Sequence, residues 1–178
     1  MQTVEFFAIV PFTAQYELDY KLLNGNIYAV FRTDKDRDSI CFTVSKDGGK
    51  AWSQPVTLKE SIQCRPRLMV YHDHILTAYN YYNTDTENRP AVQQGRTAVR
   101  LRLGENSDPN ENTLLADIHS KYGIVNICLA DILGEIYMAY SSSVLALEYQ
   151  NGNEMVRGKD AIRYICLGDL TAFNSVSD

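Results

Sequence analysis

The stretch Gly25-Asn26-Ile27-Tyr28-Ala29-Val30-Phe31 has two similar copies farther along the chain. They are Asp73-His74-Ile75-Leu76-Thr77-Ala78-Tyr79 and Gly134-Glu135-Ile136-Tyr137-Met138-Ala139-Tyr140. In each copy a turn residue stands two positions before an Ile. A small or β-branched residue stands three positions after the Ile, and an aromatic residue follows it directly. Apolar, β-branched and aromatic residues directly after a turn signal are typical of strands. The sequence therefore predicts one structural unit that occurs three times.

A candidate strand precedes each copy and another follows it. The preceding strands lie at 17–23, 67–71 and 124–132, and the following strands, after polar gaps of growing length, at 39–45, 97–103 and 161–167. A strand–turn–strand–loop–strand unit repeated at roughly 50 residues is typical of β-propeller blades. We therefore expect an all-β fold of about three propeller blades, at 13–60, 61–118 and 119–178. The alternative is an ordinary antiparallel sandwich.

The predicted blades contain at least nine strands, in three antiparallel sheets of three or four strands. Residues 111–121 come closest to a helical pattern, and a short helix there is the alternative to a strand. The residues expected in the sheet cores are Ile27, Val30, Ile75, Ala78, Ile136 and Ala139.

Composition excludes several classes of protein. The 178 residues include 17 Lys and Arg against 22 Asp and Glu, which gives a formal charge of −5, and 45% of the residues are hydrophobic. This balance is ordinary for a folded domain, and an acidic chain without a Lys/Arg block is not expected to bind nucleic acid. No apolar stretch approaches the roughly 18 residues of a membrane span. No basic region precedes the first apolar run, so no signal peptide is visible.

The cysteines and histidines show no metal-ligand pattern. Cys41, Cys128 and Cys166 lie inside apolar strand patterns, where a cysteine usually serves as a small buried hydrophobic residue. Cys64 lies outside these patterns. His72 and His74 flank Asp73 in a predicted surface turn. We therefore expect no metal and no cofactor.

The stretch Ser45-Lys46-Asp47-Gly48-Gly49-Lys50-Ala51-Trp52 follows the predicted strand at 39–45. An Asp side chain can accept hydrogen bonds from the amides of its own turn, and glycine allows left-handed backbone angles. We therefore predict a tight hairpin that Trp52 covers. This Ser-x-Asp-x-Gly-x-x-Trp pattern resembles the Asp-box of the bacterial neuraminidase repeat. In sialidase propellers that box joins the third and fourth strands of a blade, away from the active site, so the resemblance makes Asp47 and Trp52 markers of the fold.

The resemblance implies that the chain corresponds to the C-terminal half of a six-bladed, sialidase-like propeller. In that half, sialidases place a Glu on an innermost strand, an Arg at the end of the next strand, an Arg that opens the following blade and a Tyr that opens the last blade. Glu17, Arg32, Arg65 and Tyr122 stand in this order, with Arg67 as an alternative to Arg65. The resemblance implies that Tyr122 and Glu17 are catalytic and that Arg32 and Arg65 bind the substrate of an exo-sialidase-type glycoside hydrolase.

The chemistry of a sialoside gives this set of residues a physical reason. A sialic acid carries a carboxylate on its anomeric carbon, and guanidinium groups bind carboxylates well. The same charge repels a carboxylate nucleophile, so a tyrosine attacks in its place. Because a tyrosine with a pKa near 10 is neutral at pH 7, Glu17 is expected to accept the proton of Tyr122.

Part of the family's site has no counterpart in this sequence. We locate neither the third arginine nor the Asp that acts as general acid, and Ser141 stands where sialidases carry a Glu that orients the third arginine. We therefore expect the chain alone to be inactive toward sialosides. Three blades also leave two sheet faces open, so we expect a homo-oligomer or a need for the missing half of the propeller.

Other interpretations stay open at this point. Glu17 and Arg32 could form an ordinary solvated ion pair, and Tyr122 could be an aromatic residue at the start of a strand. The polar loop 80–96 is a candidate for a rim that contacts sugar. The alternative function is a non-catalytic propeller module that binds glycan or protein, and a third is a purely structural half-propeller.

Overall fold

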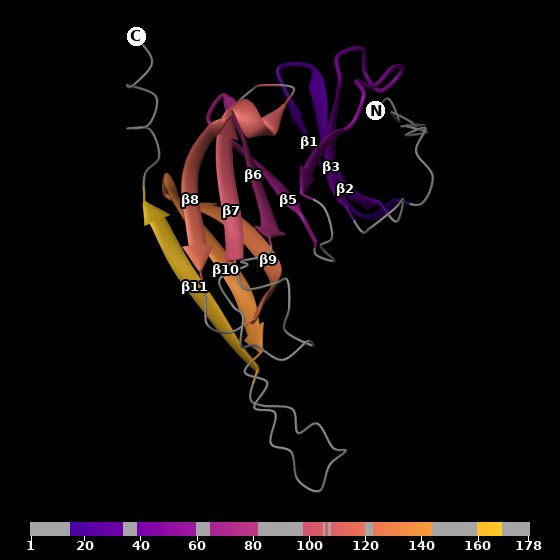
Figure 1. Ribbon diagram of the computed structural model, residues 1–178. Helices are drawn as coiled ribbons and strands as arrows, with labels where there is room; N and C mark the ends of the chain where they lie inside the picture. Colours follow the sequence, from indigo (N-terminus) through magenta and orange to yellow (C-terminus); the bar gives the residue numbers. More distant parts are fainter. Residues whose placement is uncertain are drawn as a thin grey trace, which may run out of the picture.

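The computed structural model describes residues 15–33, 39–59, 65–81, 98–104, 106, 108–119, 123–143 and 160–168. These residues form eleven strands in three antiparallel sheets of four, four and three strands (Figure 1). Among them there is no α-helix, and the one helical turn is the 3-10 turn η2 (Pro109–Glu111). The described residues accordingly contain no helix that is long and apolar enough to cross a membrane. The prediction of an all-β fold with three antiparallel sheets is confirmed.

Each sheet is built from strands that are consecutive in the sequence. The first sheet consists of β1 (Gln15–Leu23), β2 (Asn26–Thr33), β3 (Ser39–Ser45) and β4 (Val56–Lys59). The second consists of β5 (Arg67–Tyr71), β6 (His74–Tyr81), β7 (Ala98–Gly104) and β8 (Thr113–His119). The third consists of β9 (Gly123–Ile132), β10 (Glu135–Ser143) and β11 (Asp160–Gly168).

The short helix considered for residues 111–121 is wrong for the described part of this segment, because Thr113–His119 pair along β7 as strand β8. Polar side chains hold the turn that precedes β8. The Asp108 carboxylate accepts a hydrogen bond from the Asn110 amide at 2.8 Å, and the Asn112 side chain accepts one from the Asn106 amide at 3.0 Å. An open strand edge offers a full ladder of hydrogen bonds, which outweighs a weak local preference for helix.

Two-residue turns join the first two strands of every sheet, at Asn24-Gly25, His72-Asp73 and Leu133-Gly134. His72 and Asp73 are exposed, as expected of a surface turn. Since the turn fixes the strand register, the three sheets are equivalent residue by residue, with Ile27, Ile75 and Ile136 in the same place. We call the face with these isoleucines the leading face of each sheet, and the opposite face, with Val30, Ala78 and Ala139, the trailing face.

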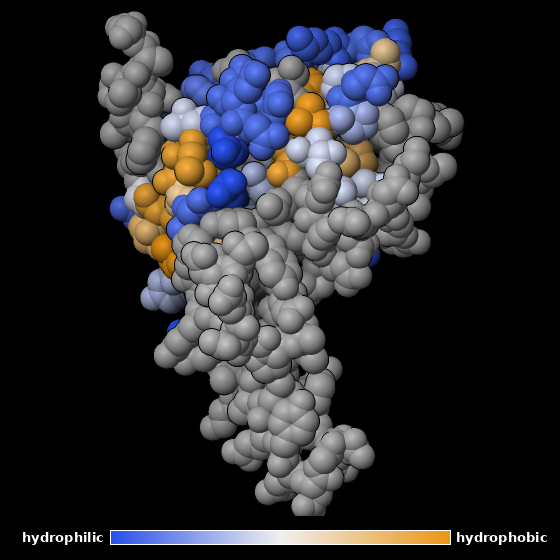
Figure 2. All heavy atoms as spheres, in the orientation of Figure 1, coloured by the Kyte–Doolittle hydropathy of each residue, from blue (hydrophilic) through white to orange (hydrophobic). Residues whose placement is uncertain are grey.

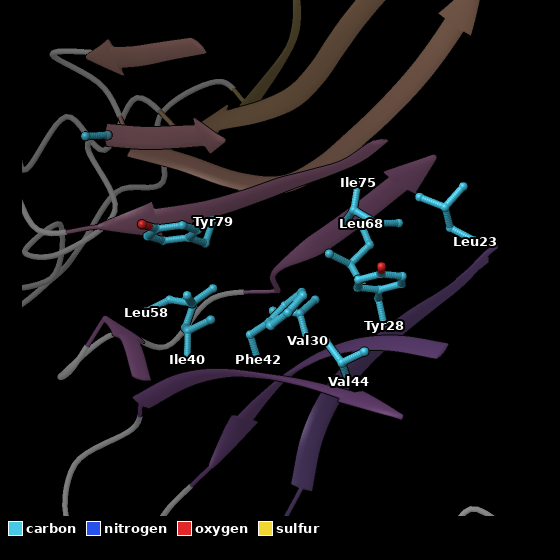
Figure 3. Packing of buried hydrophobic residues seen from close by; sticks show 11 residues of the cluster. Leu23, Tyr28, Val30, Ile40, Phe42, Val44, Leu58, Leu68, Ile75 and Tyr79 are labelled. Atoms are coloured by element: carbon cyan, nitrogen blue, oxygen red, sulfur yellow. The ribbon is translucent and has the colours of Figure 1, made fainter. Parts of the chain in front are cut away.

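The core lies between the sheets in two layers of the same kind. In the first layer, the trailing face of the first sheet packs on the leading face of the second, with Phe42 and Val30 opposite Leu68, Ile75 and Tyr79 (Figure 3). In the second layer, the trailing face of the second sheet packs on the leading face of the third in the same way. The second sheet therefore lies between the other two (Figure 1).

Burial agrees with the expected core at five of six positions, since Ile27, Val30, Ile75, Ala78 and Ile136 are all buried. Ala139 is the exception and is only partly buried. The prediction for the cysteines is correct for Cys41, wrong for Cys128 and Cys166, which are exposed, and Cys64 lies outside the described residues. All three exceptions lie on the trailing face of the third sheet, on which no other described sheet packs.

The predicted hairpin at Asp47 joins β3 to β4. The Ser45 hydroxyl donates to Asp47 Oδ1 at 2.8 Å, the Ala51 amide donates to the same oxygen at 2.9 Å, and the Gly49 amide donates to Ser45 Oγ at 2.8 Å. The hydrogen bond from the Ala51 amide, followed by that from Ser45, holds the pKa of Asp47 below its usual value. Trp52 is half-buried beside this turn. The box therefore holds the third and fourth strands of the first sheet together.

Candidate functional site

The first strands of the three sheets lie side by side in the order β1, β5, β9. The Leu68 amide donates to Asp19 Oδ2 at 2.9 Å across the first junction, and Arg67 Nε donates to the Ile127 carbonyl at 3.0 Å across the second. At the other end of β5, the Tyr71 hydroxyl donates to the Gly134 carbonyl at 3.0 Å. These contacts join start to start and end to end, so β5 and β9 run in the same direction. Residues near the starts of the first strands are thereby brought to one end of the molecule.

Glu17 lies in a β-bulge near the start of β1. The pairing with β2 is interrupted between Tyr16 and Asp19, and Glu17 has a φ of 56°, in the left-handed region that L-residues with a side chain rarely adopt. A bulge redirects the side chain of the extra residue and is common beside functional sites. The bulge directs the Glu17 carboxylate to arginines of both the first and the second sheet.

Glu17 forms an ion pair with each of two arginines. Its Oε2 atom lies 3.3 Å from Nη1 of Arg32, at the end of β2, and its Oε1 atom lies 3.3 Å from Nε of Arg65, directly before β5. The Glu17 and Arg32 side chains are 22% and 18% exposed, while Arg65 is 57% exposed. The pair with Arg32 is therefore shielded from solvent, and the pair with Arg65 is at the surface. Three of the four predicted site residues thus lie together.

Arg67, the alternative to Arg65, has a different place. Its Nε atom donates to the Ile127 carbonyl at 3.0 Å, and its Nη1 atom donates to the Pro66 carbonyl at 3.4 Å. These contacts tie β5 to β9. Of the two arginines, Arg65 is the one that contacts Glu17.

Tyr122, the predicted nucleophile, lies outside the described residues, one position before Gly123 at the start of β9. The same holds for residues 82–96 of the loop considered as a sugar-contacting rim. Tyr137, on β10, is a poor candidate for a nucleophile, because hydrogen bonding to Cys166 and Glu135 raises its pKa to about 12.

A second polar pair, which sequence reasoning did not assign, repeats the Glu17–Arg32 geometry in the third sheet. Asn126 also lies in a bulge, with a φ of 53°, and its side-chain amide donates to Ser141 Oγ at 3.1 Å. In sequence, Ser141 follows Ile136 by the same interval as Arg32 follows Ile27. That spacing marks the position, but the bulge that brings Asn126 to it leaves no sequence signal.

In the second sheet the position equivalent to Arg32 and Ser141 is Asn80, and its side chain joins the second sheet to the third. Asn80 is buried, and its Nδ2 atom donates to the Ile124 carbonyl at 2.9 Å across the junction with the third sheet. Among the described residues, the two bulges thus bring two polar groups to this end of the molecule, the Glu17–Arg32–Arg65 cluster and the neutral Asn126–Ser141 pair.

The cluster is suited to binding a carboxylate. Two guanidinium groups from neighbouring sheets lie on one acidic side chain, and each makes a single long contact to it, so an incoming anion can compete for both. Among the described residues, no three His, Cys, Asp or Glu side chains are grouped as metal ligands would be. Comparison with known proteins finds no matching family model and no matching curated protein.

Proposed function

We propose that the chain is part of a sialidase-like β-propeller glycoside hydrolase and that Glu17, Arg32 and Arg65 bind a terminal anionic sugar. The observation that carries the proposal is the double ion pair, in which one carboxylate joins arginines 15 and 48 residues away in the sequence. Three equivalent sheets with their first strands side by side support the propeller, since innermost strands line the axis of that fold.

In the proposed reaction the arginines hold the carboxylate of the sugar, and Tyr122 Oη attacks the anomeric carbon while Glu17 takes its proton. The bond to the leaving oxygen breaks, and that oxygen takes a proton from an acid that none of these four residues supplies. Because Glu17 occupies both arginines in the free protein, the substrate carboxylate must first take over these contacts. Binding thereby frees Glu17 to act as a base.

A non-catalytic module that binds anionic glycans is the second candidate. It is favoured by the same double ion pair, because a carboxylate that fixes two guanidinium groups prepares them for binding without any proton transfer. Binding to anionic sugar is common to both candidates, and formation of a covalent bond separates them.

Calorimetry tests the binding step with N-acetylneuraminic acid and its methyl ester. The acid is expected to bind and the ester is not, and Arg32→Gln is expected to lose the binding. Arg100→Gln is the matched control, since Arg100 makes a bidentate pair with Asp117 at 2.9 Å on β7 and β8, outside the cluster. Equal binding of acid and ester, or no binding of either, would contradict the proposal.

A 2,3-difluorosialic acid separates hydrolase from module. Its fluoride leaves from the anomeric carbon without a general acid, so attack by Tyr122 forms the Tyr–sugar bond, releases fluoride and passes the phenolic proton to Glu17. If the chain is a hydrolase, mass spectrometry is expected to find the sugar adduct on Tyr122. Much less adduct is expected in Glu17→Gln. Binding without an adduct would favour the module. Natural sialosides are expected to remain uncleaved, because we locate no residue in the sequence that would act as the general acid.

A further inference from the structure

Glu17 has an equivalent position in each of the other two sheets. In each sheet this position lies two places before the first-strand residue that pairs with Val30, Ala78 or Ala139. The residues at this position are Glu17, Arg65 and Asn126. Glu17 and Asn126 also share a left-handed backbone, with φ of 56° and 53°. One level of the repeat thus carries a polar side chain in all three sheets.

The two junctions between neighbouring first strands are built alike. Asp19 accepts a hydrogen bond from the Leu68 amide of the next first strand at 2.9 Å. Arg67, which is the equivalent of Asp19, donates from Nε to the Ile127 carbonyl of the strand that follows, at 3.0 Å. In both junctions the side chain at one position of the repeat therefore reaches the backbone of the next first strand.

The level of Glu17 follows the same order of strands, β1, β5 and β9. Glu17 Oε1 lies 3.3 Å from Arg65 Nε across the first junction. Because the second junction repeats the first, Asn126 comes after Arg65, on the side away from Glu17. Among the described residues of this level, Asn126 is therefore the next polar neighbour of a ligand whose carboxylate lies on Arg32 and Arg65.

The side chain of Asn126 is fixed on one side and open on the other. Its Nδ2 atom donates to Ser141 Oγ at 3.1 Å, and this bond holds the amide group. Asn126 is exposed, and no group among the described residues donates a hydrogen bond to its Oδ1 atom. An amide oxygen accepts hydrogen bonds and cannot donate them, so the matching ligand group is a hydroxyl or an N–H and not a second carboxylate.

Polarity alone does not mark a ligand site in this molecule. Figure 2 shows hydrophilic residues gathered around η2, at the end of the second sheet opposite to Arg65. There the side-chain oxygens of Asp108 and Asn112 accept from the backbone amides of Asn110 and Asn106 and so hold a turn. The Asn126 oxygen differs from these because no backbone amide of the described chain uses it.

We propose that Asn126 determines ligand specificity next to the Glu17–Arg32–Arg65 cluster. Its Oδ1 atom accepts a hydrogen bond from a hydroxyl or an amide N–H of the same sugar whose carboxylate the arginines hold. The ligand class is thereby narrowed to sugar acids that carry an uncharged donor near the carboxylate. The inference rests on the proposed function, since the arginines must hold the carboxylate for Asn126 to meet the rest of the sugar.

Calorimetry of the full chain with N-acetylneuraminic acid tests the role of Asn126. The variant Asn126→Gly removes the side chain and keeps the left-handed backbone, which glycine adopts without strain. Its affinity is expected to fall about fivefold, the effect of one uncharged hydrogen bond. Asn24→Gly is the matched control, because Asn24 has a φ of 51° in an exposed turn at the other end of β1, and its affinity should equal that of the wild type.

Analogues of the sugar that each lack one donor, at C4, C5 or C7, identify the group that Asn126 binds. One analogue is expected to bind wild type and Asn126→Gly equally, while the other two keep the fivefold difference. That equality also shows that the variant is folded. A difference that persists with every analogue would mean that Asn126 does not act through a donor of the ligand, and would overturn the inference.

The methyl ester of the sugar separates this inference from the proposed function. If the wild type binds acid and ester equally, or binds neither, the proposed function and this inference both fail. If the wild type prefers the acid and Asn126→Gly binds the acid as tightly as the wild type does, the arginine site stands and the role of Asn126 alone is refuted.

Discussion

The first and third sheets begin with the same bulged hairpin and use it differently. Both begin with a bulged strand, at Glu17 and at Asn126, and both continue through a two-residue turn into a strand whose end faces that bulge. In the first sheet the bulge carries a carboxylate between two arginines, and in the third it carries an amide bonded to a serine. The fold thus fixes where a polar group stands, and the side chain alone decides its chemistry.

The same two sheets differ in what lies on their trailing faces. Phe42 of the first sheet is buried under the second sheet, while its equivalent in the third sheet, Tyr164, is exposed. Position within the series of sheets, and not residue type, determines burial here. Each contrast can be tested by a substitution in one sheet and its counterpart in the other.

The largest effect is expected from truncating the equivalent aromatic residues. Phe42→Ala should lower the free energy of unfolding by about 3–5 kcal/mol, because it removes a fully buried ring. Tyr164→Ala should change it by no more than about 0.5 kcal/mol in the monomer, since surface substitutions have small effects. Urea unfolding at submicromolar protein measures both values. Equal losses of stability in the two variants would contradict the conclusion that Phe42 is buried in the core and that its equivalent, Tyr164, lies at the surface.

Converting the first bulge into the third is expected to abolish ligand binding. In the double variant Glu17→Asn/Arg32→Ser, the affinity for N-acetylneuraminic acid should fall at least 100-fold, as expected when a charged hydrogen-bonding partner of a ligand is removed. Calorimetry measures the change. Unaltered affinity in this variant would refute the role of the cluster. The matched control is Arg100→Ser/Asp117→Asn, which should bind the sugar normally because this pair lies outside the cluster.

A smaller effect, a gain in stability, is expected at a position where the second sheet has a tyrosine and the first sheet has a phenylalanine. The Tyr79 hydroxyl is buried without a hydrogen-bond partner among the described residues, and the equivalent position in the first sheet is Phe31. Tyr79→Phe should therefore raise the free energy of unfolding by about 1 kcal/mol, because a buried unsatisfied hydroxyl is costly. A loss of stability in urea unfolding would mean that the hydroxyl has a partner in solution.

The smallest expected effect depends on pH and concerns the turn at Asp47. Its pKa is below the usual 3.8 in the folded protein, so the ionised carboxylate stabilises the fold above about pH 4. The contribution should be lost as the pH falls through the lowered pKa. Asp47→Asn should accordingly lower Tm by a few degrees at pH 7 and have little effect near pH 2.

The corresponding turn of the second sheet is the control for this pH dependence. It is held by the uncharged Asn112 side chain, which accepts a hydrogen bond from the Asn106 amide. Asn112→Ala should lower Tm by the same amount at every pH. Thermal unfolding from pH 2 to pH 7 compares the two variants, and a constant effect of Asp47→Asn over this range would contradict the assignment.

Local patterns were sufficient to predict most of the strands, and the resemblance to sialidases singled out Glu17, Arg32 and Arg65, which lie together in the structure. The repeated Ile after a turn fixed the hairpins, and in-register hairpins carry equivalent residues to equivalent places. Two kinds of feature escaped prediction. The bulge at Asn126 arises from pairing with β10 and has no local signature. The incomplete burial of Ala139 and the exposure of Cys128 and Cys166 depend on which sheet face is covered. The short helix left open at 111–121 is replaced by β8, because pairing with β7 outweighs the local preference of Thr113–His119.

The most direct test of the binding site follows the arginine side chains themselves. In an NMR titration of the ¹⁵N-labelled chain with N-acetylneuraminic acid, the Nε–H signals of Arg32 and Arg65 should shift together, with one dissociation constant, as the sugar carboxylate replaces Glu17. The signal of Arg100 should stay in place, because its partner Asp117 lies outside the cluster. Arg32 and Arg65 signals that do not move, or that move no more than that of Arg100, would contradict the account.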